Sequence, residues 1–175
     1  MPLADVMIKE QQWDQAQRAL MQALRLDATM HQANAGLADV YASRGQDGDL
    51  QRAIDQMELA RAQVIADPEA IEDLVVYVRK LARLYARQDD PMEATRVLET
   101  LLPDAARSRP EVIAEMAEYL AQNGQPLGAA LEYQLALERE PDNATFAAEG
   151  ARWLIAAERL AEAKKMLDRL RAIDP

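Results

Sequence analysis

Residues 110–141, PEVIAEMAEYLAQNGQPLGAALEYQLALEREP, predict two helices joined by a short turn. The apolar residues that share one helix face are Met116, Ala117 and Leu120 in the first half, and Ala129, Tyr133, Ala136 and Leu137 in the second. Gly124 lies between the two sets and ends the first helix. Because small alanines occupy both facing stripes, the two helices can approach closely while larger neighbours fill the gaps. The stretch therefore predicts a helical hairpin that closes at a proline.

Alanines at matching positions repeat this hairpin along the whole chain. The first-helix alanines are Ala4, Ala38, Ala82, Ala117 and Ala151, with gaps of 34, 44, 35 and 34 residues. The second-helix alanines are Ala16, Ala53, Ala94, Ala129 and Ala163, with gaps of 37, 41, 35 and 34 residues. The 44-residue gap holds about seven extra residues near Asp67, which is roughly two helical turns. We therefore expect the helix pair around that gap to overhang its neighbours by about a turn on each side.

Helix–turn–helix units of about 34 residues with an alanine-centred pattern and closing prolines, here Pro141 and Pro175, resemble tetratricopeptide repeats (TPR). The resemblance covers nearly the whole chain. It implies an all-α fold, a right-handed α-solenoid of about 4.5 repeats. The expected repeats of this single solenoid are residues 1–28, 29–67, 68–104, 109–141 and 142–175, with a loop at 104–109. The short first helix and the end at a repeat boundary favour a frayed start or a piece of a longer chain.

Composition supports helices and limits the classes of function. Half of the 175 residues are hydrophobic, and the chain has one Phe, two Trp and five Tyr. A net charge of −10 argues against binding nucleic acid or an anionic membrane surface. Without cysteine the chain has no disulfide, no thiolate nucleophile and no cysteine-bound metal. No stretch reaches the roughly 18 apolar residues of a membrane span.

No pattern in the chain predicts catalysis, a cofactor or a metal site. His31 is the lone histidine, and the many Asp and Glu residues are spread over helix faces without a supporting nucleophile. No glycine-rich phosphate loop is present in the sequence. For Trp13 and Trp153 we favour packing in the core or at a helix end over ligand binding. Gly150 lies inside an expected helix, where it could allow a neighbouring backbone to approach closely. We expect neither enzyme activity nor a cofactor.

The TPR resemblance implies a concave groove, lined by the first helix of each repeat, in which a partner lies as an extended peptide or a helix. The charged residues predicted to face it are Arg79, Lys80, Arg83, Arg87, Asp39, Glu115, Glu118 and Arg152. At equivalent positions the signs alternate, from Asp39 through Arg83 and Glu118 to Arg152. Two interpretations stay open. These residues pair with one another and hold the helices together, or the basic helix receives a carboxylate or an acidic peptide.

An apolar run follows the junction at Asp67. Leu74, Val75, Val76 and Tyr77 would cover all sides of one helix. The run either packs against the end of the preceding helix or forms an exposed patch for a partner or a second copy of the chain.

We therefore predict a non-catalytic protein-interaction scaffold that binds a partner segment in the groove. Two alternatives remain, a self-assembly module and a scaffold segment of a larger secretion or export protein. The sequence style, rich in Ala, Arg and Gln, favours a bacterial protein. The compartment stays open between cytoplasm and periplasm.

Overall fold

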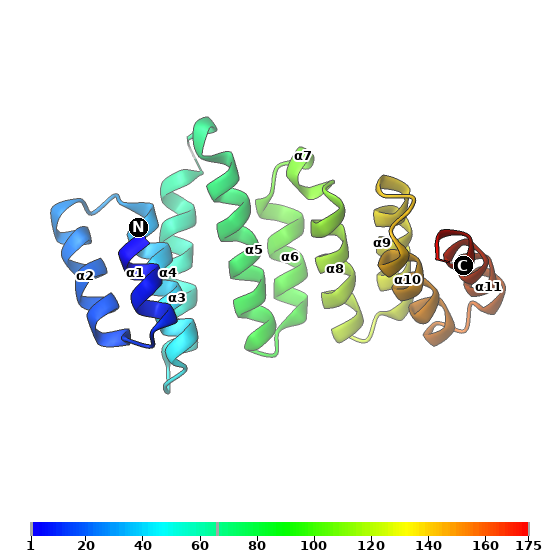
Figure 1. Cartoon of the computed structure of the whole chain (residues 1–175), viewed down its shortest axis with the longest axis horizontal. Coiled ribbons are helices and arrows are strands. Elements are labelled where there is room, and N and C mark those ends of the chain that lie inside the picture. Colours follow the sequence, from blue (N-terminus) through cyan, green and yellow to red (C-terminus); the bar gives the residue numbers. More distant parts are fainter. Residues whose placement is uncertain (1, 66, 175) are drawn as a thin grey trace. The chain divides into compact units, whose positions relative to one another are not determined.

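The computed structural model describes residues 2–65 and 67–174, and over these residues helices alternate with short turns (Figure 1). No strand occurs in this described part of the chain. The all-α prediction is thereby confirmed. The chain divides into two compact units, Met1–Asp89 and Asp90–Pro175.

The first unit begins with a short helix and continues with longer ones. Its elements are α1 (Pro2–Lys9), α2 (Trp13–Leu26), α3 (His31–Arg44), α4 (Asp49–Val64), the short 3-10 helix η1 (Pro68–Ala70) and α5 (Ile71–Arg87). Asp67 caps η1, because its side chain accepts a hydrogen bond from the backbone N–H of Glu69, and a proline follows at the first helical position. α4 has 16 residues and α5 has 17, against 14 in α2 and α3. Both helices at the 44-residue gap are therefore longer than the helices before them.

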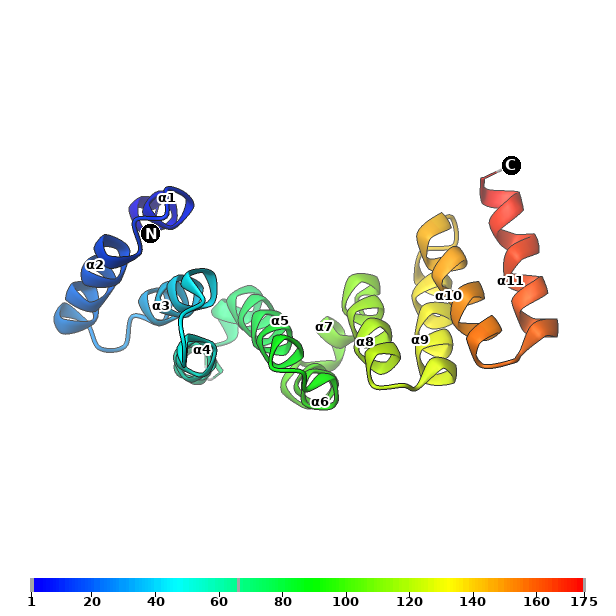
Figure 2. The ribbon, with the colours of Figure 1, turned by 90° about the horizontal axis from the view of Figure 1, so that it is seen from below.

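One core cluster of the first unit lies between α2 and α3, which pack side by side (Figure 2). Its buried residues are Ala16, Leu20, Ala33, Leu37 and Val40. Gly36 makes the close approach possible. A Cβ atom at Gly36 would lie only 2.8 Å from Cδ2 of Leu20, a side chain that is fully buried. A larger residue at position 36 would therefore push the two helices apart.

The second unit contains the hairpin predicted at residues 110–141. Its elements are α6 (Pro91–Leu101), α7 (Asp104–Arg107), α8 (Pro110–Gln122), α9 (Pro126–Arg139), α10 (Ala144–Ala156) and α11 (Leu160–Ile173). Within the unit α8 packs against α9, α9 against α10, and α10 against α11. Gly124 has a φ of +69°, the left-handed conformation that glycine adopts at low cost, and so turns the chain from α8 into α9.

The predicted loop at residues 104–109 is wrong in part, because residues 104–107 form the short helix α7. Tertiary contacts explain the difference. Ala106 is buried, and the Arg107 guanidinium donates a 2.5 Å hydrogen bond to the Glu99 carbonyl oxygen and a 2.6 Å bond to the Asp104 carboxylate. These contacts hold a helical turn that is too short to show a periodic pattern in the sequence.

One core cluster of the second unit joins α9, α10 and α11. Its buried residues are Ala130, Leu137, Ala147, Ala151, Leu154, Ala163 and Met166. A Cβ atom at Gly150 would lie 3.2 Å from Cε of Met166 and 3.4 Å from Cβ of Tyr133. The close approach expected at Gly150 is therefore present, but side chains rather than a backbone make it.

Candidate functional site

Two residues of the predicted basic face of α5, Lys80 and Arg87, are engaged within the first unit. Lys80 Nζ lies 2.6 Å from Asp39 Oδ2, and the Arg87 guanidinium donates a 2.9 Å hydrogen bond to the carbonyl oxygen of Ala42. Both contacts link α5 to α3. Arg79 and Arg83 have interactions of their own as well. These contacts favour the pairing interpretation for α5, with Asp39 meeting Lys80, and binding of an acidic segment there stays a prediction.

The apolar run on α5 is mostly buried. Leu74, Val75 and Tyr77 are each at most 5% exposed, whereas Val76 is 46% exposed. Of the two interpretations, packing against the preceding helix holds for the three buried residues and the exposed patch does not, because α5 packs against α4 and takes them into the interior. Val76 alone of the four lies open to a partner.

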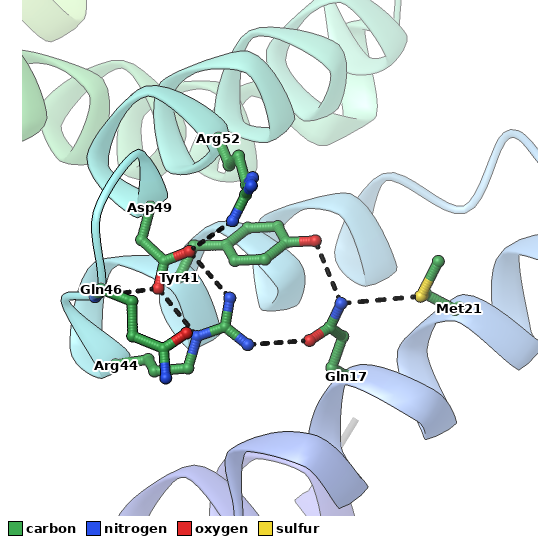
Figure 3. A network of polar contacts seen from close by, with 7 residues as sticks. All are labelled: Gln17, Met21, Tyr41, Arg44, Gln46, Asp49 and Arg52. Atoms are coloured by element: carbon green, nitrogen blue, oxygen red, sulfur yellow. Dashed lines mark hydrogen bonds and ion pairs between the residues drawn. The ribbon is translucent and has the colours of Figure 1, made fainter.

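A buried carboxylate organises the turn between α3 and α4 (Figure 3). Asp49 is fully buried and accepts two 2.8 Å hydrogen bonds from the Arg44 guanidinium, with a further 3.1 Å bond from Arg52. The hydrogen bond from Arg44 is the main cause that lowers the pKa of Asp49 to about 2. Gln17 of α2 accepts a hydrogen bond from Arg44 and donates one to the Tyr41 hydroxyl. This network is satisfied internally and ties three helices together.

The lone histidine is also part of an internal contact. His31 Nδ1 lies 2.9 Å from the Tyr77 hydroxyl oxygen and 4.0 Å from Asp73 Oδ2. Burial is the main cause that raises the pKa of Tyr77 to about 12, and the charges of Asp73 and Asp39 add to it. Within residues 2–65 and 67–174, no group of three or more His, Cys, Asp or Glu side chains could hold a metal ion. No helix in these segments combines the length and the apolar character needed to cross a bilayer.

A hollow of the second unit, here named the α8–α10 cavity, has a volume of about 530 Å³ and is lined by residues of α8, α9 and α10. α8 contributes Ala114, Glu118, Ala121 and Gln122. These four residues recur at intervals of four, three and one, so they share one helix face. The small side chains of the two alanines leave room for the hollow, and the longer side chains of Glu118 and Gln122 also line it.

Aromatic rings form much of the cavity wall. The Tyr133 side chain comes from α9, and Phe146 and Trp153 come from α10. Tyr133 is buried, and its ring centroid lies 6.4 Å from that of Phe146. Asn143 fixes the start of α10, because its side chain accepts a 3.2 Å hydrogen bond from the backbone N–H of Phe146. Phe146 and Trp153 are seven residues apart, two helical turns, and therefore lie on the same side of α10.

Charged groups of both signs meet at this wall. The Arg152 guanidinium carbon lies 4.7 Å from the centroid of the Trp153 ring, and Arg152 Nη1 lies 3.1 Å from Glu149 Oε2. Burial, together with the negative charges of Glu118 and Glu149, raises the pKa of Tyr133 to about 12, although Arg152 acts in the opposite direction. Two carboxylates and one guanidinium thus act on the cavity.

No protein-family model matches the chain, and no curated protein matches its sequence. Solved structures do match it. One is MamA, from residue 41 to its end, of Desulfovibrio magneticus RS-1, with a TM-score of 0.71 and 12% identity, covering 99% of this chain and 92% of that one. A second is YrrB, described as a TPR protein with an unusual peptide-binding site, with a TM-score of 0.71 and 19% identity over 100% of this chain and 84% of that one.

A third comparison settles the fold. The TPR-like repeats of a putative kinesin light chain from Podosopora anserina match with a TM-score of 0.72 and 21% identity, over 98% of this chain and 92% of that one. The chain has the TPR fold. The predicted fold class is thereby confirmed, and at these identities the likeness concerns the fold alone.

Two of the groove residues predicted from the TPR resemblance, Glu118 and Arg152, meet at the α8–α10 cavity. Glu115 is on α8 but does not line the cavity, and the predicted residues of α3 and α5 belong to the first unit. Sequence reasoning missed the aromatic lining from Tyr133, Phe146 and Trp153. The seven-residue spacing of the chain's one Phe and one of its two Trp, with Glu149 between them, was the available signal.

Proposed function

We propose that the protein is a non-catalytic interaction scaffold that binds a segment of a partner protein in the α8–α10 cavity. The observation that carries this proposal is the meeting of aromatic rings and charged groups around a hollow of about 530 Å³. Ligand sites in proteins commonly have volumes in this range, with an apolar wall and a few polar groups that orient the ligand. Tyr and Trp are also the residues that most often carry the binding energy of protein interfaces.

The TPR fold supports a peptide segment as the occupant. α8 and α10 are the first helices of two successive predicted repeats, and in TPR proteins these helices line the groove in which partners lie. YrrB, whose structure matches, is described as having a peptide-binding site. A preformed wall lowers the ordering cost of the scaffold, so the flexible partner supplies most of the entropy loss on binding.

A displayed library of random peptides, selected on the wild-type protein, tests the proposal. Each selected peptide is then measured against Ala121→Trp, which fills the cavity, and against Ala161→Trp, an exposed position on α11 outside it. We expect Ala121→Trp to weaken binding by about tenfold or more and Ala161→Trp to leave it unchanged. Circular dichroism must show the same helicity for all three proteins. Peptides that bind Ala121→Trp as tightly as the wild type would remove the cavity from consideration.

The second candidate function is the binding of an acidic partner segment by α5, because the side chains of Arg83 and Arg87 are exposed. Exchanging both for Glu should abolish binding of an acidic peptide and leave helicity and melting nearly unchanged. A large loss of stability in that variant would instead show that the two residues act in internal pairing, as the contact of Arg87 with the Ala42 carbonyl already indicates.

A further inference from the structure

We propose that the outer face of α9 pairs with the same face of a second copy of this chain. In this contact the two helices run antiparallel, and Glu132 of each copy forms an ion pair with Arg139 of the other. The inference goes beyond the proposed function, because it concerns the side of α9 that points away from the α8–α10 cavity. It also moves self-association from the apolar run of α5, which is mostly buried, to α9.

Three leucines form an exposed ridge along α9. Leu127, Leu131 and Leu135 recur at intervals of four residues and are between 38% and 52% exposed. Leu131 and Leu135 each lie two residues from Tyr133, about 200° around the helix, so the ridge lies opposite the ring that lines the α8–α10 cavity. Ridges with this spacing pack into the matching grooves of another helix. The outer face of α9 therefore has the apolar surface on which a second helix can pack.

A hollow lies beside the ridge. This hollow, here named the α7–α9 hollow, has a volume of about 350 Å³. Its apolar lining comes from Ile113 and Met116 of α8 and from Leu135 of α9. Its charged lining residues are Asp104, Arg107, Glu132 and Arg139. Because Leu135 belongs to both the ridge and the hollow, a helix that packs on the ridge can place a side chain in the hollow.

Two of these four charged residues are unpaired. Arg107 Nη2 lies 2.6 Å from Asp104 Oδ1, so these two charges compensate each other. In the part of the chain that the structure describes, the side chains of Glu132 and Arg139 form no hydrogen bond or ion pair. Burial is the main cause that raises the pKa of Glu132, and the negative charge of Glu99 adds to it. A cation beside Glu132 would offset both effects.

A second copy supplies both missing partners at once. Glu132 and Arg139 are seven residues apart, a rise of about 10.5 Å, whereas ion pairs within a helix join residues three or four apart. In an antiparallel pair of identical helices the same side of each helix meets, and a two-fold axis makes every contact reciprocal. Glu132 then meets Arg139 of the second copy, and Arg139 meets Glu132 of the second copy.

The arrangement of charges favours a second copy over a partner of one sign. An acidic segment would pair with Arg139 alone, and a basic segment would pair with Glu132 alone, so either would leave one charge unpaired. With 14 residues, α9 presents less surface than the roughly 800 Å² that each partner buries in a standard interface. We therefore expect a reversible dimer that forms as the protein concentration rises.

Light-scattering mass, measured on the full chain across a concentration series, tests the inference. We expect the mass of the wild type to rise from monomer to dimer. Glu132→Arg and Arg139→Glu each place like charges against each other, so each should weaken the association by about tenfold or more. An equimolar mixture of these two variants should associate again, because copies of opposite charge at both positions then face each other.

The control variants make the same changes of net charge elsewhere in the second unit. Lys164→Glu and Asp168→Arg lie on α11, which contributes nothing to the α7–α9 hollow. We expect each to alter the association by less than about twofold. Leu131→Gln, at an exposed position, shortens the ridge without changing the charge and should also weaken the dimer. Circular dichroism checks the helicity of every variant, and if Glu132→Arg melts early, Leu131→Gln serves as the test.

Three outcomes would overturn the inference. A constant monomer mass would leave the outer face of α9 to another protein. A dimer that neither the charge reversals nor Leu131→Gln weaken would place self-association elsewhere in the chain. A mixture of the two charge reversals that stays monomeric would show that Glu132 and Arg139 do not pair between copies. The proposed function is tested separately, because the peptide selection described above depends on the cavity on the opposite side of α9.

Discussion

At the scale of single residues, Asp49 holds a full negative charge without exposure to water, because Arg44 bonds to both of its oxygens. We expect Asp49→Asn to lower the free energy of unfolding at pH 7 by about 3 kcal/mol, since it leaves the Arg44 charge without its partner. The pKa of Asp49 is about 2 in the folded protein against a usual 3.8. Its contribution is therefore complete above pH 3.8 and is lost as the pH falls through about 2.

Urea unfolding at pH 7, 4 and 3 measures this effect. The difference between wild type and Asp49→Asn should shrink as the pH falls. Asp55→Asn, at an exposed position of α4, is the control and should show little difference at any pH. A difference for Asp49→Asn that stays constant down to pH 3 would contradict the assignment of the lowered pKa to this carboxyl.

Two glycines inside helices should respond in opposite ways to alanine. At Gly36 the new methyl group would lie 2.8 Å from a buried Leu20 atom, and we expect a loss of about 1 to 3 kcal/mol. At Gly128 the nearest atom is 3.6 Å away, an ordinary contact, so the gain in helix propensity should stabilise the protein by up to about 1 kcal/mol. Urea unfolding of both variants measures the change in the free energy of unfolding relative to the wild type. A stable Gly36→Ala would mean that Leu20 can move aside.

At the scale of elements, the pair between Lys80 and Asp39 connects α5 to α3. Both side chains are about one third exposed, so solvent weakens their attraction. A double-mutant cycle with Lys80→Ala and Asp39→Ala should give a coupling energy of about 0.5 to 1 kcal/mol at low salt. The coupling should fall as salt is added. A coupling energy of zero at low salt would show that the contact between Lys80 and Asp39 does not stabilise the packing of α5 on α3.

Helices with a periodic apolar face could be predicted from the sequence, and those without one could not. The hairpin of α8 and α9 follows from its alanine stripes and from Gly124, which needs a left-handed turn. α7 was missed because four residues cannot show a period and because its helical turn depends on the contact of Arg107 with Glu99. Contacts between different elements are invisible to the periodic pattern of a single helix.

The candidate site also combines residues that could be predicted from one helix alone with residues whose role depends on their neighbours in space. Glu118 and Arg152 were predicted because they lie opposite a buried stripe, a property that one helix shows alone. The role of Trp153 depends on what lies beside it, and sequence reasoning favoured the core or a helix end. It does pack against the core of the second unit, and it also lines the cavity. The burial of Tyr77 similarly depends on its neighbours in space.

At the scale of the whole molecule, each compact unit contains a core cluster with a tryptophan packed against it. Trp13 packs on the core of the first unit and Trp153 on that of the second. In repeat proteins stability is approximately a sum over repeats and their interfaces, so damage in one part need not reach another in full. Gly36→Ala should therefore lower the urea midpoint seen by Trp13 clearly more than the midpoint seen by Trp153.

Variants with a single tryptophan, Trp153→Phe for the first unit and Trp13→Phe for the second, make this comparison direct. Each is measured with and without Gly36→Ala. Equal shifts of both midpoints would show that the two units unfold as one cooperative body.

The contact of Arg152 with Trp153 has a consequence for kinetics. Arg152 covers the Trp153 ring face, so a partner side chain that packs on the same face would have to displace it, and the return of Arg152 would assist the departure of that partner. Such exchange would shorten the residence time of a bound partner. Arg152→Ala removes this competition, and we expect selected peptides that depend on the α8–α10 cavity to dissociate several-fold more slowly, as stopped-flow fluorescence would measure. An unchanged dissociation rate would mean that the peptide and Arg152 do not compete for the Trp153 ring.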